Sequence, residues 1–149
     1  MLGATHEYEL LIQEQHLDTF GHVNNATYLQ ILEQARWDLV TRNGYGLDEV
    51  HRRKIGPVVL EIRLHFRREL RNRQRVTIRS WVEAYSGKTG KFAQHILDDA
   101  GNLCCEALFT VGLFDLTARK LIPPTPEWLA ALGLRAEELG AGPERRDPA

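Results

Sequence analysis

The hydrophobic pattern changes its period once along this chain, and that change limits the folds it can form. Between residues 26 and 42, apolar side chains recur every three or four positions, which predicts a helix with one apolar stripe. Between residues 58 and 114, apolar and polar residues alternate, which predicts strands with one buried face. One apolar helix beside a sheet with one apolar face predicts a two-layer α+β domain.

The expected elements follow the order strand, long helix, four strands and short helix. The first strand is expected at 6–12, and Asn24 or Asn25 is a suitable N-cap for the long helix. The region between this helix and residue 58 is expected to be a basic loop. The later strands are expected at 58–67, 75–85, 91–98 and 103–114, the last broken at Gly112. Short turns between these strands predict an antiparallel meander, and Thr125-Pro126 is expected to open the short helix.

The composition is that of one globular domain. The chain has 149 residues, 43% of them hydrophobic and 26% charged, which suits a single domain at 1–139. The segment 140–149 holds Gly, Pro and charge and is expected to be disordered. Neither a signal peptide nor a membrane span is apparent, so we expect a cytoplasmic protein. A small sheet with open edges predicts a homo-oligomer formed by edge pairing.

Several catalytic classes are excluded by the residues that the chain lacks. Serine occurs only at Ser80 and Ser86, outside any G-x-S-x-G motif, so a serine-triad hydrolase is not expected. The adjacent Cys104 and Cys105 cannot form a disulfide framework or a cysteine-rich zinc site, and no helix start activates them. Nucleotide-binding glycine motifs are absent. We therefore expect neither cofactor nor metal.

Charge is unevenly distributed along a nearly neutral chain. The net charge is −1, which does not suit a general nucleic-acid binder. Residues 51–75 nevertheless hold nine basic residues against two acids. This segment predicts a site for an anionic small molecule, with a solvated strand edge as the alternative.

One polar loop, at 16–28, leads directly into the long helix and contains Asp18 and His22. A helix N-terminus offers unpaired N–H groups and a partial positive charge, which can stabilise a developing oxyanion. A carboxylate just upstream can act as base or nucleophile. Asp18 is therefore the candidate for acyl hydrolysis, and a simple capped helix with an Asx turn is the alternative.

This segment resembles the signature of the hot-dog-fold thioesterases, in the branch of the 4-hydroxybenzoyl-CoA and acyl-ACP thioesterases. The matching residues are Asp18, Gly21, His22, Val23, Asn24, Asn25, Tyr28, Leu29, Glu33, Ala35 and Arg36. The resemblance covers roughly residues 8–132. It implies a long central helix wrapped by a five-stranded antiparallel sheet, in a homodimer or homotetramer that binds the acyl thioester at the dimer interface.

The resemblance also implies roles for individual residues. Asp18 matches the catalytic aspartate, which acts as base on water or as nucleophile. The residues implied to bind substrate or the oxyanion are His22, Asn24, Asn25, Ala26, Tyr28 and Glu33. The residues implied to bind the phosphates of CoA are Arg67, Arg68, Arg71, Ser86, Lys88 and Lys91. Phe20 and His16 stand where some relatives carry further catalytic groups, which favours a mechanism with a lone aspartate.

The sequence thus predicts an acyl-CoA thioesterase. Three alternatives stay open: a non-catalytic acyl-thioester-binding protein, an acyl-ACP thioesterase, and a hot-dog dehydratase that uses His22. The depth of the acyl pocket depends on how Trp37, Trp81 and Phe66 pack.

Overall fold

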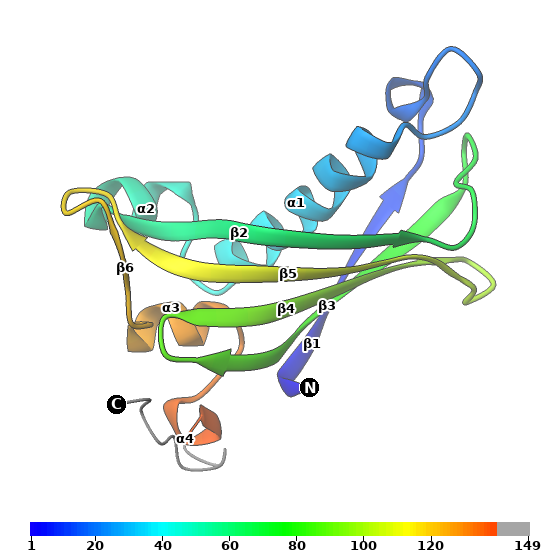
Figure 1. Ribbon diagram of the computed structural model, residues 1–149. Helices are drawn as coiled ribbons and strands as arrows, with labels where there is room; N and C mark the ends of the chain where they lie inside the picture. Colours follow the sequence, from blue (N-terminus) through cyan, green and yellow to red (C-terminus); the bar gives the residue numbers. More distant parts are fainter. Residues whose placement is uncertain (140–149) are drawn as a thin grey trace.

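The computed structural model describes residues 1–139, so the expected disordered segment 140–149 lies outside the described part. One antiparallel sheet lies against a single long helix (Figure 1). The strands are β1 (Leu2–Leu11), β2 (Ile55–Phe66), β3 (Arg75–Ser86), β4 (Thr89–Asp98), β5 (Leu103–Asp115) and β6 (Lys120–Ile122). The helices are α1 (Asn25–Arg42), α2 (Leu47–Arg53), α3 (Pro126–Ala131) and α4 (Ala136–Leu139), with a 3-10 turn, η1, at Glu14–His16.

The sheet order is β1-β3-β4-β5-β2, and β6 pairs with the end of β5. The predicted four-strand meander is therefore wrong for its first member, because β2 pairs with β5 and not with β3. The connection between β2 and β3 is a loop at 67–74 rather than a tight turn. Leu70 in this loop is fully buried, so its side chain anchors the loop to the hydrophobic core.

Helix α1 forms as its sequence predicts. Asn24 caps it, since its side chain accepts a hydrogen bond from the N–H of Ala26. Beyond Arg42, Gly44 takes a φ of +87°, the left-handed conformation that ends many helices. The buried residues of α1 are Tyr28, Ile31, Leu32, Ala35, Leu39 and Val40. They recur at helical spacing and form the face that packs on the sheet.

Strand β2 contains a bulge between Val59 and Glu61 that shifts the predicted alternation. Val59 pairs with Val111, and Ile62 pairs with Phe109. Because Val111 and Phe109 lie on the same face of β5, Val59 lies on the face of Ile62, where simple alternation had placed Leu60. The strand lies at the edge of the sheet and leaves large apolar side chains exposed: Val59, Leu60, Ile62 and Phe66.

Three further details differ from expectation. The basic segment after α1 contains a helix, α2, with Asp48 and Glu49 in its first turn and basic residues in its last, an order that suits the helix dipole. Two short elements, β6 and α4, are too brief to leave a periodic signal. Strand β5 continues through Gly112, where a Cβ would lie only 2.7 Å from Leu121 and 2.9 Å from the Lys88 carbonyl.

A buried polar network joins α1 to the sheet. The fully buried Gln94 accepts a hydrogen bond from Arg36 Nη1 (3.0 Å). Its own Nε2 donates to the Leu32 carbonyl and to Ser80 Oγ, both at 3.0 Å. Arg36 also lies 4.3 Å from the centre of the Phe109 ring. Burial lowers the pKa of Arg36 to about 10, so the residue remains a cation within the core at neutral pH.

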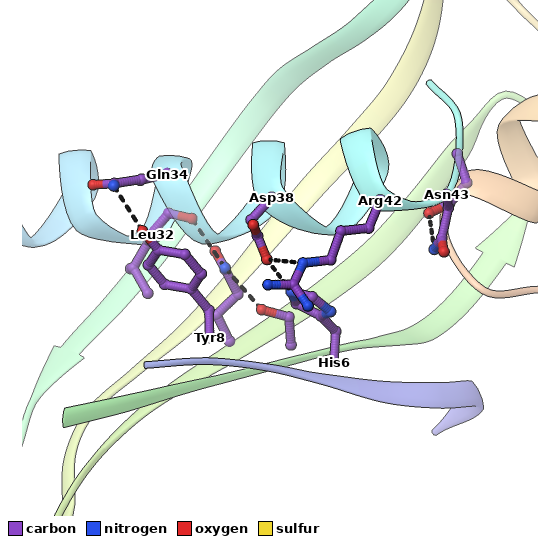
Figure 2. Close-up of polar contacts among 10 residues, drawn as sticks. His6, Tyr8, Leu32, Gln34, Asp38, Arg42 and Asn43 are labelled. Atoms are coloured by element: carbon purple, nitrogen blue, oxygen red, sulfur yellow. Dashed lines mark hydrogen bonds and ion pairs between the residues drawn. The ribbon is translucent and has the colours of Figure 1, made fainter. Parts of the chain in front are cut away.

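Polar contacts also hold strand β1 against α1 (Figure 2). His6 Nε2 lies 3.0 Å from Asp38 Oδ2, which also pairs with Arg42 Nε at 3.0 Å. Gln34 donates to the Tyr8 hydroxyl at 2.7 Å. These contacts lie along the helix face that meets β1. Within residues 1–139, no helix is long and apolar enough to cross a bilayer.

Candidate active site

The loop before α1 is closed by main-chain hydrogen bonds. Leu17 and Val23 form an isolated antiparallel bridge. Inside that bridge, the N–H of Asp18 donates to the His22 carbonyl (2.8 Å), and the N–H of Gly21 donates to the Asp18 carbonyl (3.1 Å). Gly21 takes a φ of +80°, which favours glycine at this turn. The sequence therefore folds into a short closed turn that ends directly at the helix cap.

The Asp18 carboxylate is held by this same turn. Its Oδ1 accepts hydrogen bonds from the N–H of Phe20 (2.9 Å) and of His22 (3.2 Å). This is the Asx-turn geometry that an aspartate adopts in a loop. The side chain is half-buried, so the carboxylate is both fixed in place and accessible from solvent.

The N-terminus of α1 is largely capped by its own asparagines. The N–H of Ala26 is shared between Asn24 Oδ1 (2.8 Å) and Asn25 Oδ1 (2.9 Å). The N–H groups of Thr27 and Tyr28 donate to the Asn24 carbonyl. Within residues 1–139, the N–H of Asn25 makes no hydrogen bond. Of the two N–H groups expected to bind an oxyanion, Asn25 is available as it stands, whereas Ala26 requires Asn24 and Asn25 to turn away.

A cleft of about 350 Å³ opens beside this helix start. Its lining residues are Val23, Asn25, Tyr28, Phe66, Arg67, Arg68 and Glu69. Tyr28 is buried and packs edge-on against Phe66, with 4.9 Å between ring centres. Burial raises the pKa of Tyr28, so its hydroxyl stays protonated and cannot act as a base near neutral pH. Tyr28 therefore lies in the wall of this cleft.

His22 meets a residue that sequence reasoning missed. Its Nε2 lies 2.5 Å from Oε1 of Glu69, in the loop between β2 and β3. Glu69 stands 47 positions from His22, so no local motif contains both residues. The one available signal was an acidic residue inside an otherwise basic stretch.

The loop that carries Glu69 is fixed on both sides. Arg73 pairs with both carboxylate oxygens of Glu14 at 2.8 Å, and this pairing lowers the pKa of Glu14 to about 2. The N–H groups of Arg67 and Arg68 both donate to the Cys104 carbonyl. Because Leu70 is also buried, the loop is held in place where it lines the cleft.

The residues expected to bind CoA fall into two groups. Arg67 and Arg68 line the cleft, and Arg71 lies in the same loop. Ser86, Lys88 and Lys91 lie at the β3–β4 hairpin, at the opposite end of the sheet (Figure 1). These two ends of the sheet are about 24 Å apart, because β5 runs from Cys105 at one end to Gly112 at the other and a strand rises about 3.4 Å per residue. One protomer therefore does not bring the six residues together.

A second cavity of about 230 Å³ lies farther along α1. It contains Glu33 and Arg36, and its other lining residues are Trp37, Leu39, Val40, Pro57, Val58, Val59, Phe92, Val111, Trp128 and Leu132. Glu33, which the resemblance implied to bind substrate or the oxyanion, thus lines this distal cavity and lies about 12 Å along the helix from Asn25. Trp81 faces the other side of the sheet, where its ring meets His95.

No cysteine takes part in this site. Cys105 pairs with Phe66 across the sheet and is fully buried. Burial raises the pKa of its thiol to about 12, which leaves almost no thiolate at neutral pH. The part of the chain that the structure describes also contains no cluster of three or more His, Cys, Asp or Glu able to hold a metal ion.

A curved antiparallel sheet around one long helix, with a carboxylate loop at the helix start, defines the hot-dog-fold class of thioester hydrolases. Residues 12–132 match the thioesterase-like superfamily, and the chain belongs to this family. The predicted fold and the predicted enzyme class are thereby confirmed.

Individual relatives agree with this assignment. The long-chain acyl-CoA thioesterase FadM of Escherichia coli strain K12 is 34% identical over 115 residues, covering 76% of this chain and 86% of that protein. The structure of the probable thioesterase YbaW from E. coli is 30% identical, covers 85% of this chain and 98% of its own, and superposes with a TM-score of 0.76. The S. aureus protein SAV2348, solved in complex with CoA, is 15% identical with a TM-score of 0.81, over 99% of this chain and 92% of its own, and shows the fold alone.

Proposed function

We propose that this protein hydrolyses acyl-CoA to a free acid and CoA, with Asp18 as the catalytic residue. The observation that carries the proposal is the Asp18 carboxylate, fixed by two N–H groups in the loop that leads into α1. A cleft opens at the same helix start. FadM, the relative named above, is an acyl-CoA thioesterase by name.

The chemistry needs few groups. Asp18 takes a proton from water as the water attacks the thioester carbonyl, or its carboxylate attacks directly and forms an anhydride that water then cleaves. The N–H of Asn25, at the positive end of the helix, stabilises the oxyanion. The tetrahedral intermediate expels the CoA thiolate, which is a good leaving group because its thiol pKa is low, and the thiolate then takes up a proton. In a single turnover in water labelled with heavy oxygen, label on Asp18 identifies the nucleophilic route, because water that attacks the aspartyl carbonyl of the anhydride leaves its oxygen there.

The cleft offers a binding site for the phosphates of CoA. Arg67 and Arg68 stand at its rim, and guanidinium groups suit phosphate geometry. Arg67 also pairs with Glu106 at 3.1 Å, a contact that bound phosphate would replace.

The acyl chain would lie between α1 and β2. The cleft at Asn25 and the distal cavity at Arg36 are about 17 Å apart along the helix, at 1.5 Å per residue. Ile62 and Phe66 leave apolar surface exposed along that path. A path of this length suits a long acyl chain, the class for which FadM is named.

A homodimer would complete this groove. Strand β2 is an edge strand with exposed apolar side chains, and a second β2 paired antiparallel would cover them. Such pairing would also bring the partner's hairpin at 86–91 to the end of the sheet that carries Arg67. A tetramer remains the alternative, and the expected cytoplasmic location stays a prediction.

The proposal is tested by release of thiol from a panel of acyl-CoA substrates. The wild type is expected to release thiol and Asp18→Asn is not. Binding of acyl-CoA without turnover would favour a binding protein, and preference for acyl-ACP over acyl-CoA would favour the acyl-ACP thioesterases. Hydration of an enoyl thioester would point to a dehydratase.

A further inference from the structure

We propose that the outer face of the sheet carries a second binding site, which takes a carboxylic acid with an apolar body. The site is a hollow of about 430 Å³ on the face of the sheet that is turned away from α1. Pockets for small molecules begin at about 300 Å³, so the hollow is large enough for such a ligand. It shares no lining residue with the cleft at Asn25 or with the distal cavity at Arg36.

The register of the strands explains why this hollow forms. One row of paired residues crosses β2, β5, β4 and β3 on the outer face, and it consists of Arg63, Leu108, Ala93 and Trp81. Ala93 has the smallest side chain of this row and lies between Leu108 and Trp81, so the surface is low at its position. Neighbouring strands lie about 4.8 Å apart, so the row spans about 14 Å from the guanidinium end to the indole end.

The floor of the hollow is apolar. Trp81 is 8% exposed and Ala93 is 5% exposed, although both lie on the face of the sheet away from the core. The Trp81 ring packs edge-on against the ring of His95, with 4.7 Å between ring centres. An apolar ligand body that lies over Ala93 and Leu108 would remove this floor from water, which favours binding.

The carboxylates beside the hollow are already paired. Glu106 accepts a hydrogen bond from Arg67 at 3.1 Å. Glu83 accepts a hydrogen bond from the Trp81 indole N–H and pairs with the N-terminal amine at 3.4 Å. The Arg63 guanidinium, in contrast, makes no hydrogen bond or ion pair within residues 1–139. The unpaired charge at the hollow is therefore positive.

Two histidines form the next row together with Glu106. His65 and His95 each pair with Glu106 in the register of the sheet, so both lie on the outer face beside the first row. Burial lowers the pKa of His95, so its ring is neutral near pH 7 and offers one N–H donor rather than a second charge. The positive charge for a ligand comes from Arg63.

A carboxylic acid with an apolar body suits both ends of the first row. Its carboxylate would pair with the planar guanidinium of Arg63, which matches the geometry of a carboxylate. Its apolar body would reach over Ala93 towards Trp81. Inorganic phosphate would suit Arg63 as well, but it would leave the apolar floor uncovered. Acids of this class are products of thioester hydrolysis, yet the binding itself does not depend on the proposed function.

The test is a titration of the wild type with hexanoate, followed by NMR of the histidine rings. Hexanoate is expected to shift the ring signals of His65 and His95 and to bind with a Kd of about 1 mM, an ordinary affinity for a ligand of this size. Hexanamide has the same shape without the charge, and acetate has the charge without the apolar body. Each is expected to bind about tenfold more weakly or worse.

Three variants locate the binding. Arg63→Gln removes the cation, and the affinity for hexanoate is expected to fall about tenfold or more. Ala93→Leu fills the floor of the hollow and is expected to abolish the shifts at His65. Arg79→Gln is the matched control, because Arg79 carries the same charge on the same face, pairs with Glu7 and does not line the hollow. Its affinity should be within about twofold of the wild type.

Several outcomes would overturn the inference. They are equal affinity for hexanoate and hexanamide, equal losses in Arg63→Gln and Arg79→Gln, and shifts confined to His22 beside the cleft at α1. A changed sedimentation coefficient in Ala93→Leu would also overturn it, because a second copy of the chain would then cover the hollow. A wild type that releases no thiol would overturn the proposed function alone, since hexanoate binding is measured without hydrolysis.

Discussion

Asp18 and His22 are joined by two hydrogen bonds that close the loop in front of α1. The N–H of Asp18 donates to the His22 carbonyl at 2.8 Å, and the N–H of His22 donates to Asp18 Oδ1 at 3.2 Å. The same carboxylate that we assign to catalysis therefore also holds the loop together. The two roles can be separated, because an amide oxygen accepts these hydrogen bonds but cannot act as a base.

We therefore expect Asp18→Asn to lose activity without losing its loop. Thiol release should fall by about 10²-fold or more, the usual cost of removing a general base. The free energy of unfolding should change little, since the asparagine Oδ1 still accepts from Phe20 and His22. Asp18→Ala should lose both the activity and about 1 kcal/mol of stability, the usual contribution of such hydrogen bonds. Equal stability losses in the two variants, measured by urea denaturation, would show that the charge itself holds the loop.

Local patterns explain why this part of the site was predictable. Asp18, the Asn24 cap and α1 lie within one stretch of sequence, and their contacts span only a few residues. The glycine at 44, which ends α1, and the alternation of apolar and polar residues in β3 and β4 also depend only on neighbouring residues in the sequence. Such features depend on periodicity and side-chain chemistry that a single sequence displays.

Features that depend on distant partners were not predictable. The place of β2 beside β5 is set by pairing between residues about fifty positions apart, and its bulge is visible only against that partner. Glu69 reaches the site through a crossing loop, and the basic stretch around it gave no reason to single it out. The occupied N–H of Ala26 depends on which way two asparagine side chains turn.

The exposed edge of β2 leads to a prediction on assembly. Ile62→Lys places a charge on the apolar face of this strand, and we expect it to convert the proposed dimer into a monomer. Glu61→Lys is the matched control, because Glu61 is the neighbouring position on the opposite face. Sedimentation of both variants measures the outcome. A dimer that survives Ile62→Lys would place the interface elsewhere.

The Gln94 network leads to a prediction on stability. Gln94→Leu leaves the half-buried guanidinium of Arg36 without its acceptor, and we expect a loss of about 2 kcal/mol in the free energy of unfolding. Gln94→Glu keeps an acceptor opposite the cation and should lose less, although it gives up the bond to the Leu32 carbonyl. Urea denaturation of both variants tests this order. The reverse order would mean that shape at this position matters more than pairing.

His95 leads to a prediction on pH. Its ring contacts Trp81 on the outer face of the sheet. Burial lowers the pKa of His95 below the ordinary 6.5, and the charge of Arg79 lowers it further, whereas Glu106 and Glu83 raise it by a smaller amount. The unfolded chain then binds a proton more readily than the folded one. Stability should therefore fall as the pH drops from 6.5 through the lower folded pKa. His95→Gln should make the dependence of unfolding free energy on pH less steep in that range, and an unchanged slope would assign it to other groups.

The distal cavity leads to a prediction on substrate length. Val58 lines this cavity together with Trp37 and Trp128, at the far end of the path from Asn25. Val58→Phe adds a ring that fills part of its 230 Å³, so the end of a long acyl chain no longer fits. We expect kcat/KM for long-chain acyl-CoA to fall about tenfold or more, the scale for a methylene-sized misfit in an apolar pocket. Short-chain substrates do not reach the cavity and serve as the internal control. A loss that is equal for short and long chains would mean that the acyl chain follows another route, or that the substitution disturbs α1 as a whole.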